Sequence, residues 1–198
     1  MSNVYVISDL HLSHLNMAIR RGFKTIEAHD NHIIESWNSV VNKKDTVWVL
    51  GDLTMERSQP YKLLDELKGI KNVVLGNHDK PQHIQEMLKY INKVCGSFKY
   101  KDCILTHIPI HEREMKRYRL NVHGHLHSNG IGDARYVNVS CEQIDYKPVL
   151  LNKVINKEEK FSKSVHGLCP DCTFPIIQGD NYSGIKCSNS NCGYWFCY

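Results

Sequence analysis

Five short apolar segments each end in an Asp, Asn or His, and this repeated pattern constrains the fold more than any other feature of the sequence. The segments, with the polar residues that follow them, span residues 4–11, 46–52, 72–79, 103–107 and 121–127. Apolar runs of this length and Val/Ile content are typical of strands in a sheet covered on both faces. Because ligands bind outside the carboxyl ends of strands in open sheets, we expect the five ends to assemble one site.

The side chains at these strand ends have the chemistry of metal ligands. Imidazole and carboxylate groups suit divalent ions such as Mn, Fe, Ni and Zn, and two such ions can act together as a catalytic pair. A single histidine of this kind is more often structural, but the joint pattern indicates a centre of two divalent ions. The candidate ligands are Asp9, His11, Asp52, Asn77, His107, His125 and His127.

The order of these motifs resembles that of the calcineurin-like metallophosphoesterases. The resemblance covers the first three-quarters of the chain and rests on Asp9-x-His11, Gly51-Asp52, Gly76-Asn77-His78-Asp79, His107 and Gly124-His125-x-His127. Three further segments, Asp9–Asn16, Glu35–Asn38 and Tyr136–Ser140, look like a small branch of that family, without a cap domain, from phage and bacteria. The resemblance implies an α/β (α+β) fold, a four-layer α-β-β-α sandwich.

The resemblance also implies a role for each strand-end residue. The implied ligands are Asp9, His11 and His127 for one ion, Asn77, His107 and His125 for the other, and Asp52 as the bridge between them. Water ionised between the ions would attack the phosphorus, since a bound divalent ion can lower the pKa of water to ~7. His78 would stabilise the transition state or protonate the leaving oxygen, and Asp79 would orient the His78 ring. The ions and their ligands together would keep a small positive charge, which suits a phosphate anion.

The spacing of apolar residues predicts strands that alternate with helices in the first half of the chain. The apolar residues of 25–41 fall on one helical stripe, with Thr25 as the N-cap. A helix is expected to end at Gly69, and another to run from near Pro81 to Ile91. The second half has short β-like runs with no long helical pattern between them. We therefore expect two packed sheets with helices outside, in one metallophosphoesterase domain over residues 1–155.

Five of the eight cysteines lie between residues 169 and 197. They follow a charged segment without an apolar face, which we interpret as a linker over residues 156–165. The two cysteine pairs that come next are typical of a zinc ribbon, so residues 166–198 are expected to form a small module around one structural zinc. The expected ligands are Cys169, Cys172, Cys187 and Cys192. The second pair is spaced more widely than usual, which leaves Cys197 as an alternative to Cys192.

The leading functional hypothesis is hydrolysis of phosphodiesters or phosphomonoesters. The segments between the motifs are too short for a cap domain, so we expect an open cleft, with His14, Asn16 and Arg21 as candidate substrate contacts on the first loop. Two alternatives stay open: a nuclease that the ribbon guides to DNA or RNA, and a non-catalytic binding or scaffold protein. The expected partners are a phosphoester, a nucleotide or nucleic acid, and a macromolecule bound through the ribbon.

Charge and hydropathy add two expectations. The net charge of +4 gives only a mild attraction to phosphate-rich partners and does not identify a nucleic-acid binder. No apolar run approaches the ~18 residues of a transmembrane helix, and the first strand begins almost at Met1, which leaves no room for a signal peptide. We expect a cytoplasmic protein without a membrane partner, located in the host cytoplasm if the chain is phage-encoded.

Overall fold

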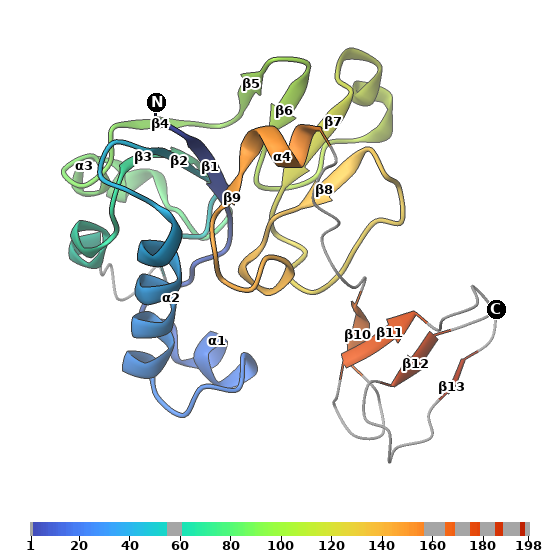
Figure 1. The fold of residues 1–198 in the computed structure, drawn as a ribbon, viewed down its shortest axis with the longest axis horizontal. Coiled ribbons are helices and arrows are strands. Elements are labelled where there is room, and N and C mark those ends of the chain that lie inside the picture. The colour runs from blue at the N-terminus through green and yellow to red at the C-terminus, as the bar shows by residue number, and fades with distance from the viewer. Residues whose placement is uncertain are drawn as a thin grey trace.

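Two sheets form the main body of the protein (Figure 1). A computed structural model describes residues 2–54, 61–156, 165–168, 175–178, 185–187 and 195–196, and beyond residue 156 only the backbone is described. The first sheet has five strands in the order β4-β3-β2-β1-β9, and the second has four in the order β5-β6-β7-β8. Among the described residues, no helix is long and apolar enough to cross a membrane.

The first sheet contains β1 (Val4–Ile7), β2 (Thr46–Val49), β3 (Ile70–Val74), β4 (Lys93–Cys95) and β9 (Val149–Leu150). The second contains β5 (Phe98–Tyr100), β6 (Cys103–Leu105), β7 (Leu120–His123) and β8 (Tyr136–Asn138). The α-helices are α1 (Leu15–Arg20), α2 (Ile26–Val40), α3 (Ile84–Met87) and α4 (Leu151–Ile155). Four 3-10 helices complete the body: η1 (Tyr61–Glu66), η2 (Pro81–His83), η3 (Glu112–Arg117) and η4 (Cys141–Gln143).

Most neighbouring strands run parallel, and this direction determines where the polar loops lie. β1 to β4 are parallel to one another and only β9 is antiparallel. β6, β7 and β8 are also parallel, with β5 antiparallel at the edge. At the ends of the two sheets, Ser8 forms a parallel bridge with Ser140, which follows β8. The carboxyl ends of β1 and β8 therefore meet at one edge of the molecule.

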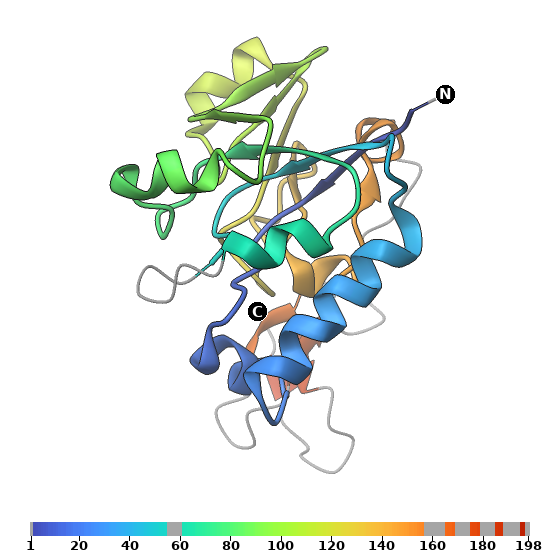
Figure 2. The ribbon, with the colours of Figure 1, turned by 90° about the vertical axis from the view of Figure 1, so that its left-hand side faces the viewer.

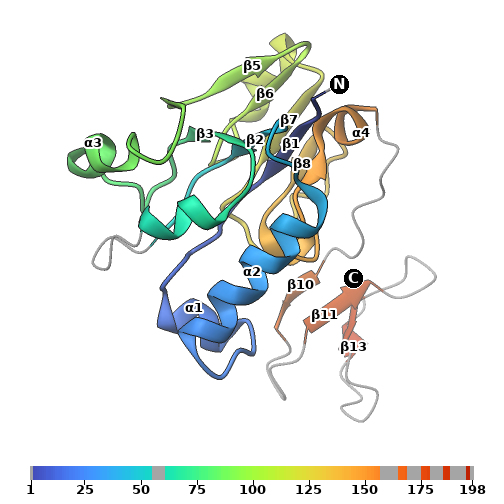
Figure 3. The same ribbon diagram turned by 60° about the vertical axis from the view of Figure 1, so that its left-hand side comes forward.

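The core is continuous across both sheets. Val49 of β2 and Leu105 of β6 belong to the same cluster of buried side chains. The rings of Trp48 and Phe98 stack with their centroids 4.0 Å apart, which joins β2 to β5. Figure 2 and Figure 3 show α2 lying across the face of the first sheet that is turned away from β5–β8.

Helix α2 is anchored at both ends by contacts that its sequence allows. Thr25 is extended, and its hydroxyl accepts a hydrogen bond from Ala28 N at 3.1 Å, which satisfies one of the free amides of the first turn. Towards its other end, Trp37 is fully buried and its indole nitrogen donates to the Lys68 carbonyl at 2.8 Å. The helix predicted for residues 25–41 is confirmed.

The α/β class and the two packed sheets predicted from the sequence are confirmed, and several local elements differ from expectation. Residues 15–20, expected in a loop, form α1. The helix expected from Pro81 to Ile91 is reduced to η2 and α3, and the segment that ends before Gly69 contains η1. The strand β4 was not predicted, because three residues are too short to display a period.

The C-terminal segment forms a third sheet, in which β10 (Val165–Leu168), β11 (Pro175–Gln178), β12 (Ile185–Cys187) and β13 (Trp195–Phe196) are antiparallel neighbours. Three predicted zinc ligands, Cys169, Cys172 and Cys192, lie outside the described residues, as does the alternative Cys197. Cys187 ends β12, but only its backbone is described. The zinc site and the division into 1–155, 156–165 and 166–198 stay predictions.

The Thr25→Ala variant tests the cap of α2. Loss of the hydroxyl should lower the free energy of unfolding by about 1 kcal/mol and the melting temperature by about 2–4 °C, measured by urea and thermal unfolding. Thr25→Ser keeps the acceptor and should behave like the unaltered chain. An equal loss in both variants would show that the methyl group, and not the cap, contributes the stability.

Candidate metal centre

The loops that follow β1 and β2 are bonded to each other beyond the ends of the strands. Asp9 N donates to the Gly51 carbonyl at 3.1 Å, and His11 N donates to the Asp52 carbonyl at 2.9 Å. On the second sheet, Gly124 N donates to the His107 carbonyl at 3.0 Å. These contacts continue the strand pairing, so the polar side chains predicted as ligands are carried to one edge of both sheets.

Two glycines allow the loops to approach this closely. A Cβ at Gly124 would overlap the Ser8 hydroxyl and the Asp9 carboxylate. A Cβ at Gly76 would overlap the backbone and the carboxylate of Asp52. Any other residue at either position would push an aspartate out of the site.

Left-handed backbone is concentrated at this edge. Such a conformation is uncommon outside glycine and costs of order 1–3 kcal/mol per residue. It persists where surrounding contacts impose it, which is typical of functional sites. The predicted ligands with a positive φ are Asp9 (60°), His11 (50°), Asp52 (55°), His125 (68°) and His127 (49°).

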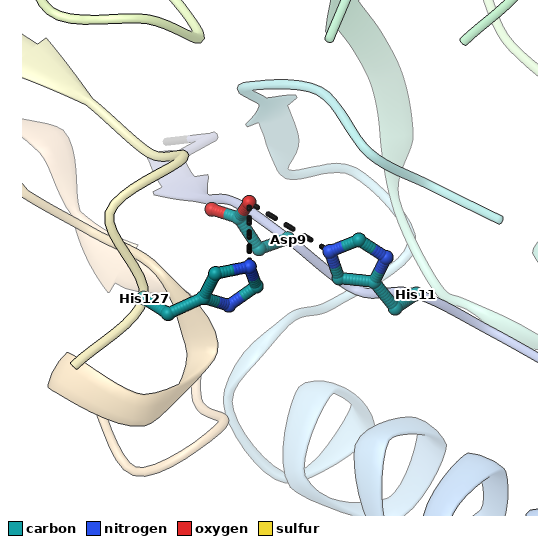
Figure 4. Close-up of side chains that lie close together, drawn as sticks. All are labelled: Asp9, His11 and His127. Atoms are coloured by element: carbon teal, nitrogen blue, oxygen red, sulfur yellow. Dashed lines mark ion pairs between the residues drawn. The ribbon is translucent and has the colours of Figure 1, made fainter. Parts of the chain in front are cut away.

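Asp9, His11 and His127 form the first group of ligand atoms (Figure 4). The His11 Nε2 and His127 Nε2 atoms lie 3.9 and 4.0 Å from Asp9 Oδ1. These gaps are too wide for hydrogen bonds. Within the described part of the chain, Asp9 Oδ1 and both ring nitrogens of His11 are buried without a hydrogen-bond partner. Burial of such atoms is costly, and a cation among them would satisfy them, so the group fits a metal ion.

Asn77, His107 and His125 form the second group. Asn77 Oδ1 lies 2.9 Å from His107 Nε2 and 3.0 Å from His125 Nδ1, and the two nitrogens are 3.2 Å apart. His107 Nδ1 lies 2.8 Å from the Leu50 carbonyl, to which it can only donate. When the ring is charged, Nε2 also carries a proton and can donate it to Asn77 Oδ1. An ion at this point would displace that proton and bind the lone pair of Nε2.

Asp52 lies between the two groups. Its Oδ2 atom is 3.7 Å from His11 Nε2 and 3.4 Å from His107 Nε2. Its Oδ1 atom accepts a hydrogen bond from His78 N at 3.0 Å, which holds the carboxylate in place. Asp52 thus lies beside a ligand nitrogen of each group, which is the position expected of a bridging ligand.

The pKa values follow from burial and from this crowding of charge. Burial lowers the pKa of His11 to about 2, so its ring is neutral and its nitrogens can bind an ion. Burial raises the pKa of Asp9. Burial by itself would raise the pKa of Asp52 and lower that of His107. The contact between these two side chains outweighs burial, so the pKa of Asp52 falls to about 2 and that of His107 rises to about 9. Despite burial, the raised pKa of His107 reflects the charges of Asp52 and Asp9 beside it.

A profile of the calcineurin-like phosphoesterases matches residues 2–171 of the chain. The chain belongs to this family. Uncharacterized protein MJ1445 of Methanocaldococcus jannaschii is 32% identical over 172 residues, covering 81% of this phosphoesterase and 93% of that protein. The gene 66 protein of Mycobacterium phage L5 is 31% identical over 166 residues, covering 65% of this chain and 79% of the phage protein. The crystal structure of AQ665 from Aquifex aeolicus, a protein of unknown function, is 26% identical with a TM-score of 0.62, covering 80% of this chain and 100% of that one.

His78 and Asp79 of this phosphoesterase differ in their surroundings. The His78 side chain is 34% exposed, with Nε2 4.0 Å from Asp52 Oδ2, so it lies at the mouth of the site. The Asp79 carboxylate is buried and accepts from the backbone nitrogens of Asp52, Leu53 and Gly76 at 2.8–3.1 Å. Through these contacts Asp79 joins the Asp52 loop to the Asn77 loop. The sequence had suggested a different role for Asp79, that of orienting the His78 ring.

The three predicted substrate contacts lie in different environments. Asn16 is exposed in the first turn of α1, and His14 is half-buried, with its ring centroid 5.5 Å from that of His11. The Arg21 side chain is only 2% exposed, and its Nε atom donates to Glu142 at 2.8 Å. Arg21 therefore lies behind the ligands, where a substrate does not reach it.

Sequence reasoning missed Glu142. Its Oε1 atom lies 3.0 Å from His127 Nδ1, on the side of the ring opposite Nε2. A signal was present, because Glu142 also follows a β-like run, the segment 136–140, just as the predicted ligands follow theirs. Cys141, which separates this segment from the carboxylate, obscured the signal.

The Asp9→Asn variant separates the ligand role of Asp9 from its effect on stability. Removal of a buried carboxylate with one unsatisfied oxygen should raise the melting temperature of the metal-free protein. Mn²⁺ at a hundredfold its dissociation constant should stabilise the unaltered chain by about 2.7 kcal/mol and should have a much smaller effect on the variant. Thermal unfolding with and without Mn²⁺ measures both effects. An equal response to Mn²⁺ in the two proteins would contradict the assignment.

Proposed function

We propose that this phosphoesterase hydrolyses phosphate esters at a centre of two divalent metal ions. The observation that carries the proposal is Asp52, whose Oδ2 atom lies 3.7 Å from His11 Nε2 in the first group and 3.4 Å from His107 Nε2 in the second. Imidazole, carboxylate and amide donors together suit Mn, Fe, Ni or Zn. The proposed ligands are Asp9, His11 and His127 for one ion and Asn77, His107 and His125 for the other.

When bound, the two ions supply Lewis-acid activation of water and positive charge for the phosphate. The protein's own groups then have separate tasks. His107 is kept in one tautomer by the Leu50 carbonyl, and Asp79 holds the Asp52 loop against Gly76. His78, at the mouth of the site, can donate a hydrogen bond to the phosphate or a proton to the leaving oxygen.

Hydrolysis of bis-p-nitrophenyl phosphate and of p-nitrophenyl phosphate tests this proposal. We expect Mn²⁺-dependent release of p-nitrophenol from at least one of them. His78→Ala should lower kcat by about 10²–10⁴-fold while Mn²⁺ content stays the same, and Asp52→Asn should lose both activity and metal. Undiminished hydrolysis in His78→Ala and Asp52→Asn would overturn the mechanism. Mn²⁺ binding without hydrolysis of any ester would instead favour the non-catalytic reading.

A cavity of about 320 Å³ adjoins the second group of ligands. It is lined by Leu75, Gly76, Asn77, Gly96, Thr106, His107 and Ile108. None of these is a lysine, arginine, aspartate or glutamate, so a second phosphate there would lose its hydration without an ion pair. We propose that the cavity holds the uncharged organic part of the ester, of aryl or nucleoside size.

Gly96→Leu tests this placement. A Cβ at Gly96 meets no atom within 4 Å, and its φ is not left-handed, so a leucine fits without strain at this position in the cavity lining. We expect a higher KM for an aryl ester and little change for methyl phosphate, with Mn²⁺ binding unchanged. Gly130→Leu is the matched control, since a Cβ there is also free of contacts and lies outside the cavity. An unchanged KM for the aryl ester in Gly96→Leu would contradict the placement.

We also propose that Cys169, Cys172, Cys187 and Cys192 hold one structural zinc ion. The spacing of the cysteines supports this, as does the position of each pair beside strands of the antiparallel sheet β10–β13. Four thiolates can close a tetrahedral site and stabilise a segment too small for its own apolar core. A nucleic-acid or protein partner for this module stays a prediction.

A further inference from the structure

A series of buried polar contacts leads from α2 to His127. His29 Nδ1 is 2.9 Å from Asp30 Oδ1, and His29 Nε2 is 2.9 Å from Arg21 Nη1. Arg21 Nε donates to Glu142 Oε1 at 2.8 Å, and the same oxygen lies 3.0 Å from His127 Nδ1. The series joins α2, the loop after α1 and η4, which are far apart in the sequence.

Arg21 is held at each of its nitrogens. Besides the bond to Glu142, Nη2 donates to the Asp9 carbonyl at 2.7 Å and Nη1 donates to the Leu10 carbonyl at 3.0 Å. Because the guanidinium is planar and rigid, these bonds place the Asp9 backbone and the Glu142 carboxylate in one fixed relation.

This network supports each member of the first ligand group, one through its side chain and two through the backbone. Glu142 accepts the His127 Nδ1 proton, which leaves the Nε2 lone pair facing Asp9. Arg21 fixes the backbone of Asp9 directly. Asp30 accepts from the nitrogen and the hydroxyl of Ser13 at 3.0–3.1 Å and so holds the loop on which His11 lies.

The second ligand group is supported in a different way. His107 is oriented by the Leu50 carbonyl, and the Asn77 loop is held through Gly76 by Asp79. Within the described residues, neither Arg21 nor Glu142 forms a hydrogen bond to a member of that group, so the two groups can be perturbed separately.

We propose that Arg21 and Glu142 are a positioning pair for the ion site of Asp9, His11 and His127, and for that site alone. The inference rests on the proposed two-metal centre. The pair adds no net charge to the site, because the guanidinium and the carboxylate cancel. Its contribution is orientation: it fixes the tautomer and direction of one ligand and the backbone of another. Such carboxylate–histidine contacts behind a metal ligand strengthen binding by about 10–100-fold.

The test is a titration with Mn²⁺, followed by calorimetry and electron paramagnetic resonance, of the 198-residue chain stripped of metal and then given one equivalent of zinc for its cysteines. The same zinc content in every sample keeps the comparison between variants equal. The unaltered chain should bind two Mn²⁺ ions and give the spectrum of a coupled pair. Glu142→Gln, which keeps the shape of the side chain, should weaken one site by about 10–100-fold and give the spectrum of an isolated ion.

A double variant separates positioning from a purely structural role. Glu142→Gln alone leaves the Arg21 charge without its partner, which destabilises the fold. Arg21→Gln/Glu142→Gln removes both charges, so its melting temperature should recover relative to the single variant, whereas the weakened Mn²⁺ site should stay weak. Arg135→Gln is the matched control, since it breaks the ion pair with Asp133, which lies at the surface, and should leave both Mn²⁺ sites unchanged.

The possible results distinguish a failure of the positioning role from a failure of the proposed metal centre. Two sites of unchanged affinity in Glu142→Gln, or an equal loss at both sites, would overturn the positioning role. Recovery of Mn²⁺ affinity together with stability in the double variant would also overturn it, because the pair would then be only structural. Failure of the unaltered chain to bind two ions would overturn the metal centre itself, and the positioning pair with it.

Discussion

The structure depends on two aspartates, Asp9 and Asp52, that are buried at the carboxyl ends of the strands. Each faces imidazole nitrogens that lie 3.4–4.0 Å from its carboxylate. Asp9 and Asp52 are 0% and 2% exposed. Carboxylates so far from water are costly unless a cation or a set of donors compensates them. Backbone and hydroxyl donors compensate only part of the charge: Asp9 Oδ2 accepts from Ser140 and from His125 N, while Asp9 Oδ1 is unsatisfied within the described structure. The remaining negative field makes the edge a cation site.

The rest of the fold holds this energetically unfavourable arrangement in place. Parallel strands deliver the loops to one edge, and bonds such as Asp9 N to Gly51 O continue the pairing beyond the strands. Left-handed backbone at Asp9 and Asp52, and glycines where a Cβ would collide, add further cost. The apolar core shared by the two sheets, with Trp48 stacked on Phe98, supplies the stability that offsets it.

The two ligand groups, although similar in chemistry, are supported by different means. A backbone carbonyl orients His107, whereas a carboxylate, itself bonded to a buried arginine, orients His127. A carboxylate behind an imidazole raises the basicity of the ring more than a carbonyl does, so the two sites need not bind the same ion with the same affinity. In the proposed two-metal centre, the two ions can therefore differ while they share Asp52.

The sequence by itself determined which polar residues follow the strands, the order of those strands and the helix that begins at Thr25. These features are local, since an apolar run followed by Asp or His, or a cap followed by a helical stripe, is complete within about 15 residues. Only the tertiary structure decided what Arg21 does. Its partner Glu142 is 121 positions away, and nothing near Arg21 in the chain distinguishes a substrate contact from a buried ion pair. The same holds for Asp79, whose neighbour His78 suggested one role and whose bonds to the Asp52 loop, 26 and 27 positions away, add a second role that the spacing does not reveal. Long-range contacts depend on how elements pack, and spacing along the chain does not encode that packing.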